Sequence, residues 1–183
     1  HRAWVYRVLS PTVVNAAAAL FPQRFTEKHR EWLTRQSPIV RYGQKNGYLS
    51  DSVNDCLKYH LMFFYLFLSL MTLLIVMRRL TGLIFNVPPA VKDLAPPMAL
   101  LLLPLTFLWG GYFYDFPELM LMGLCLVFLI KQRWFFYYAC FVLAVLNKES
   151  NVLLVFFFLA FFYEKFPWKL LIKHLAIHAA LGG

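Results

Sequence analysis

Two carboxylates lie on either side of a proline in the aromatic segment Tyr112-Phe113-Tyr114-Asp115-Phe116-Pro117-Glu118. Aromatic rings desolvate a neighbouring carboxylate and so shift its protonation equilibrium. Pro117 suits the first turn of a helix, which places Asp115 near the positive end of the helix dipole. Asp115 could therefore take a proton from a hydroxyl group, bind a sugar hydroxyl or bind a divalent metal ion, and Glu118 is a second candidate catalytic carboxylate. The alternative is that Asp115 only caps the helix while the tyrosines form an interfacial belt.

A second polar segment, Asn147-Lys148-Glu149-Ser150-Asn151, interrupts a long apolar run. A lysine and a glutamate in a turn between two apolar arms are either solvated or directed into a polar cavity, and an ionisable group inside a membrane protein usually has a function. In the second case Lys148 is a candidate for binding a phosphate group, and Glu149 is a third candidate catalytic carboxylate. In the first case the segment is an ordinary turn.

Basic residues gather near the N-terminus. Arg7 belongs to the segment Ala3-Trp4-Val5-Tyr6-Arg7-Val8-Leu9-Ser10-Pro11, and further cations follow at Arg24, Lys28, Arg30, Arg35 and Arg41. A guanidinium group suits bidentate contact with phosphate, and a helix in the membrane interface would hold it at the depth of lipid phosphates. Arg7 is therefore a candidate phosphate ligand, and the alternative is a general cationic surface on lipid headgroups.

Metal and thiol chemistry have less support. His174 and His178 have the spacing of two metal ligands on one helix face, but no third ligand accompanies them, so we expect a hydrogen-bonded or interfacial pair and no metal site. Cys56, Cys125 and Cys140 lack paired spacing. We expect them to serve as small apolar side chains.

The composition predicts the elements that position these residues. Hydrophobic residues make up 61% of the 183 residues, aromatic residues 19%, and the mean hydropathy is +0.59. A soluble core of this size could not bury so much apolar surface, so we expect an all-α, polytopic membrane protein. The net charge of +9 suits anionic headgroups or a phosphate-bearing substrate. Nucleic acid is not expected as a partner, because no basic helix or stacking sheet accompanies the charge.

Short charged breaks between the apolar runs alternate in sign. The breaks at 77–79, 131–133 and 164–169 are basic, and the intervening ones contain Asp115, Glu118 and the Lys148-Glu149 pair. Basic short loops stay in the cytoplasm, so the acidic breaks are expected at the outer face of a multi-pass protein of the bacterial inner membrane.

This pattern divides the chain into an outer loop and a helix bundle. Residues 1–57 are expected to carry interfacial helices at 3–21 and at 26–36, the second ending before Pro38. Residues 58–183 are expected to contain about five spans and the start of a sixth. The first span is predicted at 59–77, stopped by Arg78 and Arg79, and a proline-rich connection at 87–97 leads to spans at 98–113, with a kink at Pro104, and at 119–130.

Residues 134–163 permit two interpretations. A single helix would have 30 residues with Lys148 and Glu149 at its middle, whereas a hairpin would have two short arms that turn at 147–151. The hairpin keeps both flanking basic breaks on one side of the membrane and is therefore preferred, although its arms are short for a bilayer. A further helix is expected from Leu170. The chain begins at His1 with neither a methionine nor a signal peptide, so we expect a piece of a longer polytopic protein.

With these segments in place, the chain resembles the GT-C superfamily of polyprenyl-phosphate-dependent membrane glycosyltransferases and their bacterial relatives. The resemblance rests on the interfacial segment 3–11, on Tyr114-Asp115-Phe116-Pro117-Glu118-Leu119 entering a helix from the outer side, and on the turn Leu146-Asn147-Lys148-Glu149-Ser150, which is similar to an Asn-Arg-Glu-Thr sequence at that place in such relatives.

The resemblance implies transfer of a sugar, with inversion, from an undecaprenyl- or dolichyl-phosphate carrier to an acceptor hydroxyl at the outer face. Asp115 would match the family's second acidic residue and serve as the general base, and Arg7 would hold the carrier phosphate. The family's first acidic residue would lie before His1.

Two other classes of protein fit the same pattern. Short spans and 19 phenylalanines also suit a non-catalytic membrane subunit that packs on a larger complex. A transporter would use Lys148 and Glu149 as an ionic site on broken helices. The position of Asp115 discriminates between them, because an outward cavity favours transfer chemistry and a contact with another polypeptide favours a subunit.

Overall fold

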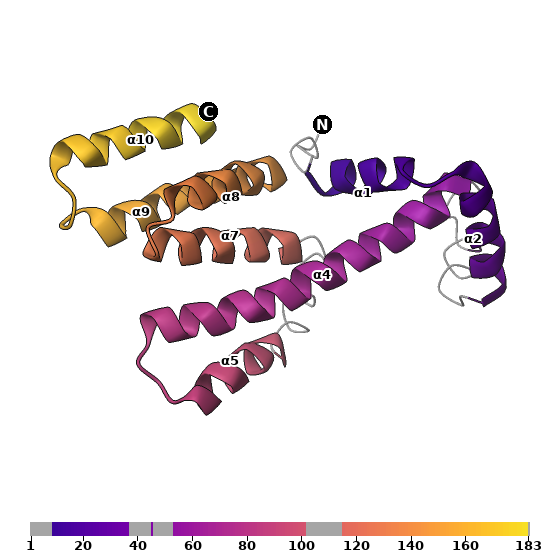
Figure 1. Cartoon of the computed structure of the whole chain (residues 1–183), viewed down its shortest axis with the longest axis horizontal. Coiled ribbons are helices and arrows are strands. Elements are labelled where there is room, and N and C mark those ends of the chain that lie inside the picture. The colour runs from indigo at the N-terminus through magenta and orange to yellow at the C-terminus, as the bar shows by residue number, and fades with distance from the viewer. Residues whose placement is uncertain (1–8, 37–44, 46–52, 102–114, 183) are drawn as a thin grey trace. The chain divides into compact units, whose positions relative to one another are not determined.

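The computed structural model describes residues 9–36, 45, 53–101 and 115–182, and within these ranges every regular element is a helix (Figure 1). The all-α prediction is therefore confirmed for the part of the chain that the structure describes. In chain order the elements are α1 (Leu9–Ala19), α2 (Gln23–Gln36), α4 (Val53–Ile84), α5 (Pro89–Leu101), α7 (Asp115–Ile130), α8 (Trp134–Asn147), the 3-10 helix η1 (Glu149–Leu153), α9 (Leu154–Phe162) and α10 (Trp168–Gly182).

The described chain forms two compact units that divide inside α4, between Phe67 and Leu68. The N-terminal unit contains α1, α2 and the first part of α4, and the C-terminal unit contains the rest of α4 and the later helices. The predicted boundary at residue 57 separates an outer loop from a membrane bundle, whereas the division after Phe67 separates two compact units. The boundary at residue 57 stays a prediction.

The second helix of the N-terminal unit corrects one local prediction. α2 ends at Gln36 as predicted but begins at Gln23, before the predicted start. Thr26 is not its first residue, and the Thr26 hydroxyl donates to the carbonyl oxygen of Pro22 at 3.2 Å, one turn back along the helix. The Pro22 carbonyl also accepts the backbone N–H of Thr26 at 3.2 Å, so the helical turn is already formed there.

Aromatic rings follow one another along α2. The ring centroids lie 5.1 Å apart for Phe21 and Phe25, 5.8 Å for Phe25 and His29, and 6.2 Å for His29 and Trp32, while His60 of α4 meets His29 edge-on at 5.6 Å. Burial and the neighbouring His60 lower the pKa of His29, so this imidazole is neutral at pH 7. Phe25 and Trp32 are still about half exposed. The interfacial position predicted for this region remains a prediction.

α4 is the longest helix, with 32 residues. Its part Leu57–Ile84 has a mean hydropathy of 2.2 and is, among the described residues, the one helix long and apolar enough to cross a membrane. The predicted span 59–77 lies inside it. The helix itself continues past Arg78 and Arg79, because arginine favours a helix, and it ends before the consecutive prolines Pro88 and Pro89.

The predicted connection at 87–97 is mostly helix rather than loop. Pro89 is the first residue of α5, where a missing N–H is tolerated, and Pro96 and Pro97 lie inside the helix. Two consecutive prolines lose two helical hydrogen bonds but do not end α5, which runs to Leu101. The kink predicted at Pro104 lies outside the described residues.

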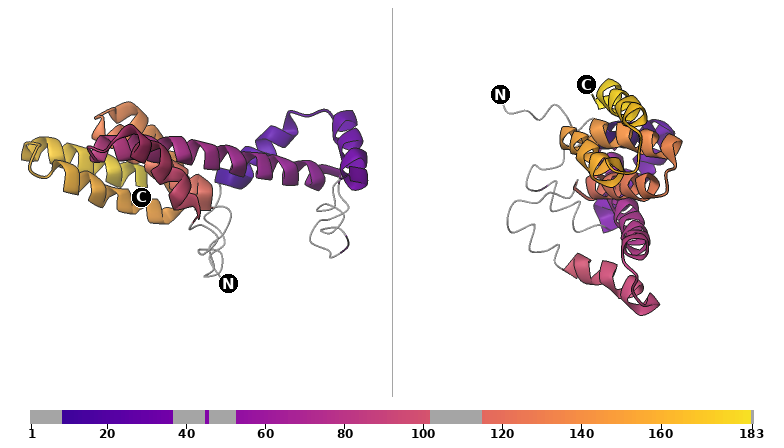
Figure 2. Two further views of the ribbon diagram at one scale, coloured as in Figure 1. Left: turned by 90° about the horizontal axis from the view of Figure 1, so that it is seen from below. Right: turned by 90° about the vertical axis from the view of Figure 1, so that its left-hand side faces the viewer.

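Helices α7, α8 and α9 are three consecutive antiparallel arms of the C-terminal unit (Figures 1 and 2). The indole of Trp134, the first residue of α8, lies 5.5 Å from the ring of Phe162, the last residue of α9. The preferred hairpin over residues 134–163 is therefore present, and the single 30-residue helix is wrong. Lys148 has extended backbone (φ −159°, ψ 127°), and the chain turns there.

The turn between α7 and α8 is formed by Lys131, Gln132 and Arg133. Gln132 has a left-handed φ of 52°. The Arg133 N–H donates to the Phe128 carbonyl at 2.9 Å and the Gln132 N–H to the Leu129 carbonyl at 3.0 Å, which is a Schellman motif. α7 thus ends at Ile130, as predicted from the charged break.

Aromatic side chains form the core of the C-terminal unit. Tyr137, Phe141 and Phe158 are fully buried, together with the free thiol of Cys125, which serves as a small apolar group as predicted. The outer faces are also aromatic: Phe135 is 80% exposed and Phe156 is 65% exposed. Apolar surface of this kind in the described structure requires lipid or another polypeptide to cover it.

The later helices are short for a bilayer. α7, α8, α9 and α10 have 16, 14, 9 and 15 residues. At 1.5 Å per residue they are about 14 to 24 Å long, less than the ~30 Å of a hydrocarbon core. Helix length therefore supports one membrane-crossing segment in the described residues, and the multi-pass arrangement is a proposal. α10 begins at Trp168, directly after Pro167 and two residues before the predicted start.

Candidate functional site

Three of the side chains singled out from the sequence meet at one end of the C-terminal unit. The Lys148 Nζ lies 2.6 Å from Glu118 Oε2 and 3.8 Å from Asp115 Oδ1. The Ser150 hydroxyl donates to Glu118 Oε1 at 3.1 Å. We call these four residues the acidic cluster. They bring the first turn of α7 together with the turn between α8 and α9.

The local structure explains how each member is positioned. Asp115 and Glu118 are three residues apart in the first turn of α7, so they share one face of the helix. Lys148 is the extended residue at which α8 ends. The Asn151 side chain fixes the turn by donating its amide hydrogens to the carbonyls of Ala144 at 2.9 Å and Lys148 at 3.1 Å. Asn151 thus caps the carboxyl end of α8.

The acidic cluster is partly buried and carries a net charge of −1. The exposed fractions of the side chains are 31% for Asp115, 15% for Glu118 and 34% for Lys148. The amino-terminal end of α7 adds positive potential beside both carboxylates. Glu118 is held by two donors, Lys148 and Ser150, and Asp115 is the more exposed carboxylate of the two, so it is more accessible to a substrate.

The other predicted site residues cannot be compared with this geometry. Arg7 and the tyrosines Tyr112 and Tyr114 lie outside the described residues. Glu149 is the first residue of η1, and its side chain lies outside the described part of the structure. Across the described residues, no group of three His, Cys, Asp or Glu side chains could hold a metal ion.

His174 and His178 each pair with a tyrosine. Tyr137 Oη lies 2.7 Å from His178 Nε2, and Tyr138 Oη lies 2.5 Å from His174 Nδ1. His178 Nδ1 lies 2.7 Å from the His174 carbonyl oxygen, which can only accept, so His178 carries its hydrogen on Nδ1. The neutral ring then accepts at Nε2 from Tyr137. The expected hydrogen-bonded pair is present, and the two tyrosines fasten α10 to α8.

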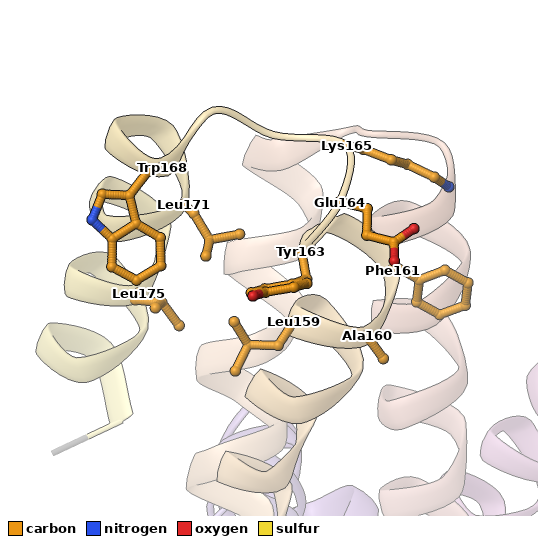
Figure 3. Close-up of a pocket in the computed structure, with 9 residues that line it drawn as sticks. All are labelled: Leu159, Ala160, Phe161, Tyr163, Glu164, Lys165, Trp168, Leu171 and Leu175. Atoms are coloured by element: carbon orange, nitrogen blue, oxygen red, sulfur yellow. The ribbon is translucent and has the colours of Figure 1, made fainter.

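A separate cavity is lined by none of the residues of the acidic cluster. A cavity of about 690 Å³ lies between α9 and α10, and Figure 3 shows Tyr163 near the end of α9 and Leu171 of α10 projecting into it. Its other lining residues are Leu159, Ala160, Phe161, Glu164, Lys165, Trp168 and Leu175. The wall is mainly apolar, so the cavity suits an apolar occupant, and Glu164 and Lys165 add charged groups to its lining.

Sequence reasoning missed Ser150 and Asn151 as structural partners of this site. Both stand in the polar segment that was singled out, and an Asn directly after a Lys-Glu-Ser turn is a common backbone cap. Comparison of the chain with protein-family models, with curated proteins and with solved structures finds no significant match.

Proposed function

We propose that the chain is part of a multi-pass membrane glycosyltransferase that uses a polyprenyl-phosphate sugar, with the acidic cluster as the polar site at its outer face. The observation that carries this proposal is the meeting of Asp115, Glu118 and Lys148. They come from two turns 30 residues apart and lie at one end of an otherwise apolar bundle.

The distribution of charge in the C-terminal unit supports the assignment of faces. The acidic cluster lies where α7 begins and α8 ends. At the other ends of these two helices, Lys131 lines a cleft with Arg78 and Arg79, and Gln132 lines another with Lys165. Basic short loops on one side and acidic turns on the other are typical of a protein that crosses the membrane repeatedly.

The geometry suggests a separate role for each member of the cluster. Asp115 is the general base that takes the proton of the acceptor hydroxyl. Lys148 binds the carrier phosphate, whose oxygens would compete with the carboxylates for its ammonium group. Glu118 is a positioning residue that holds Lys148 through their 2.6 Å contact. A positioned base of this kind contributes roughly 100- to 10,000-fold to a rate.

The test is turnover of the intact protein in lipid nanodiscs with a panel of polyprenyl-phosphate hexoses. Release of free polyprenyl phosphate is measured, so the acceptor need not be known when a membrane extract supplies it. Asp115→Asn should reduce release on the order of 100-fold or more. Glu164→Gln is the matched control, because Glu164 is an exposed acidic residue after α9.

Two results would count against the proposal. If no donor of the panel releases more carrier than protein-free nanodiscs do, the chain is not a glycosyltransferase of this type. If Asp115→Asn and Glu164→Gln release carrier equally, Asp115 is not the base.

A non-catalytic membrane subunit is the second candidate. The exposed aromatic faces of α8 and α9 favour this candidate. It is also favoured by the pairing of Glu118 with Lys148 and Ser150, which holds the turn at Lys148 against α7. In that case Asp115 would be covered by a neighbouring chain. The intact protein, solubilised from native membranes in a mild detergent, would then migrate as part of a complex with a defined partner.

A further inference from the structure

A second polar site lies at the end of the C-terminal unit opposite to the acidic cluster. The end of α4, the start of α5 and the turn after α7 surround a cleft of about 410 Å³. We call it the basic cleft. Its lining residues are Arg78, Arg79, Gly82, Leu83, Pro89, Lys92, Asp93 and Lys131. The volume is in the range of small-molecule sites.

The basic cleft carries a strong excess of positive charge. Four of its lining side chains are cationic and, among the described residues that line it, one is acidic, which leaves a net charge of +3. The carboxyl ends of α4 and α7 point toward this region, and each contributes about −0.5 charge, whereas the start of α5 contributes about +0.5. The net charge is therefore still about +2 to +3, so the cations repel one another unless an anion is bound.

Two contacts shape the basic cleft for an anion. Asp93 Oδ1 pairs with the Nε of Arg78 at 2.5 Å, which orients the guanidinium through one of its five N–H groups. The Lys92 side chain lies across Gly82, with its Cδ 3.4 Å from the place where a Cβ of Gly82 would be. The Lys92 Nζ lies 3.7 Å from the same place, so its ammonium group lies close beside α4.

We propose that the basic cleft binds a phosphate group, with Arg79, Lys92 and Lys131 as its contacts. Guanidinium and ammonium groups from three different elements can surround a tetrahedral anion, and arginine adds bidentate hydrogen bonds. The phosphate belongs either to the headgroup of an anionic lipid or to a soluble phosphate compound. The proposal does not depend on the chemistry assigned to the acidic cluster, because the two sites share no residue.

The test measures thermal unfolding of the full chain with two kinds of probe. The protein is purified in a neutral detergent and then titrated either with phosphatidylglycerol in mixed micelles, against phosphatidylcholine as the reference, or with inorganic phosphate and pyrophosphate. A ligand that binds the folded state alone raises the unfolding temperature, and the rise grows with the ratio of its concentration to its dissociation constant. The same scans without probe report whether each variant is folded.

Arg79→Gln and Lys131→Gln should each weaken the apparent affinity on the order of tenfold, the usual loss for one charge-assisted hydrogen bond. Lys169→Gln is the matched control, because Lys169 is an exposed lysine at the start of α10 and does not line the cleft. Stabilisation by phosphatidylglycerol alone assigns the site to a lipid headgroup, and stabilisation by the soluble anions assigns it to a soluble compound. No stabilisation by either probe, or an equal loss in Lys169→Gln, overturns the proposal.

Discussion

Lys148 is the residue at which two separate turns of the C-terminal unit meet. Its type and its place in a polar turn are evident in the sequence, but its partner is not, since Glu118 stands 30 residues away. Only the antiparallel packing of α7 and α8 brings them together. The chemistry of the candidate site could therefore be predicted residue by residue, whereas its pairing and the exposed fractions of its side chains depend on tertiary structure.

The energetic link between Lys148 and Glu118 can be measured with a double-mutant cycle. Because both side chains are partly exposed, we expect a coupling free energy of about 1 kcal/mol in Lys148→Met, Glu118→Gln and the double variant. Chemical unfolding in detergent micelles provides the free energies. A coupling indistinguishable from zero would mean that the ion pair does not hold the turn to α7.

Gln132 offers a change that should stabilise the protein. A left-handed residue other than glycine destabilises the folded state by about 1–2 kcal/mol. Glycine avoids this strain, but its greater entropy in the unfolded chain offsets about 0.5–1 kcal/mol of the gain. Gln132→Gly should therefore raise the free energy of unfolding by about 0.5–1 kcal/mol. Gln132→Ala keeps the strain and serves as the control in the same unfolding measurement. A loss of stability in Gln132→Gly would contradict the Schellman turn.

At the scale of elements, most helices were predictable and several boundaries were not. The end of α7 at Ile130 and the hairpin of α8 and α9 follow from charge and polarity, which mark where an apolar helix stops. The start of α2 and the helix across 89–101 were missed. In the second case the prolines at 87–97 were taken to favour a loop, whereas a proline in the first turn of a helix is compatible with it.

The packing of α4 on α7 depends on a single small residue. A Cβ at Gly123 would lie 2.6 Å from Cγ1 of Val76, which is buried and stiff. Overpacking there destabilises the folded state by about 1–3 kcal/mol. The higher helix propensity of alanine relative to glycine offsets up to about 1 kcal/mol of this loss. Gly123→Ala should therefore lower the free energy of unfolding by about 1–2 kcal/mol.

Val76→Ala removes the obstructing methyl groups and provides the partner for this test. In the Val76→Ala background, the same change at Gly123 should be neutral or stabilising, as measured by thermal unfolding. Equal destabilisation by Gly123→Ala in both backgrounds would show that the two helices do not approach at this point.

At the scale of the whole molecule, the proposed membrane arrangement rests on charge rather than on helix length. One described helix is long enough to cross a bilayer, yet the three basic breaks near residues 79, 132 and 165 lie on the side of the C-terminal unit away from the acidic cluster. The sequence could predict the alternation of basic and acidic breaks, because that alternation depends only on the order of the charged residues along the chain. It could not predict how short helices accommodate a bilayer, since that depends on lipid and on the segments around them.

Cysteine-accessibility labelling of the intact protein in sealed membrane vesicles tests the arrangement. Cysteines placed one at a time at positions 79, 132 and 165 should react with an impermeant reagent from the cytoplasmic side, and cysteines at 46, 114, 149 and 150 from the outer side, because basic short loops are retained in the cytoplasm. The parent protein carries Cys56→Ser and Cys140→Ala and keeps the native Cys125. Cys125 and the new position 150 provide an internal contrast, because the native Cys125 thiol is fully buried and should stay unlabelled, while Ser150 is exposed.

Labelling of positions 132 and 165 from opposite sides would exclude the hairpin as a membrane-crossing unit, and equal labelling of all positions from one side would place the whole C-terminal unit outside the bilayer.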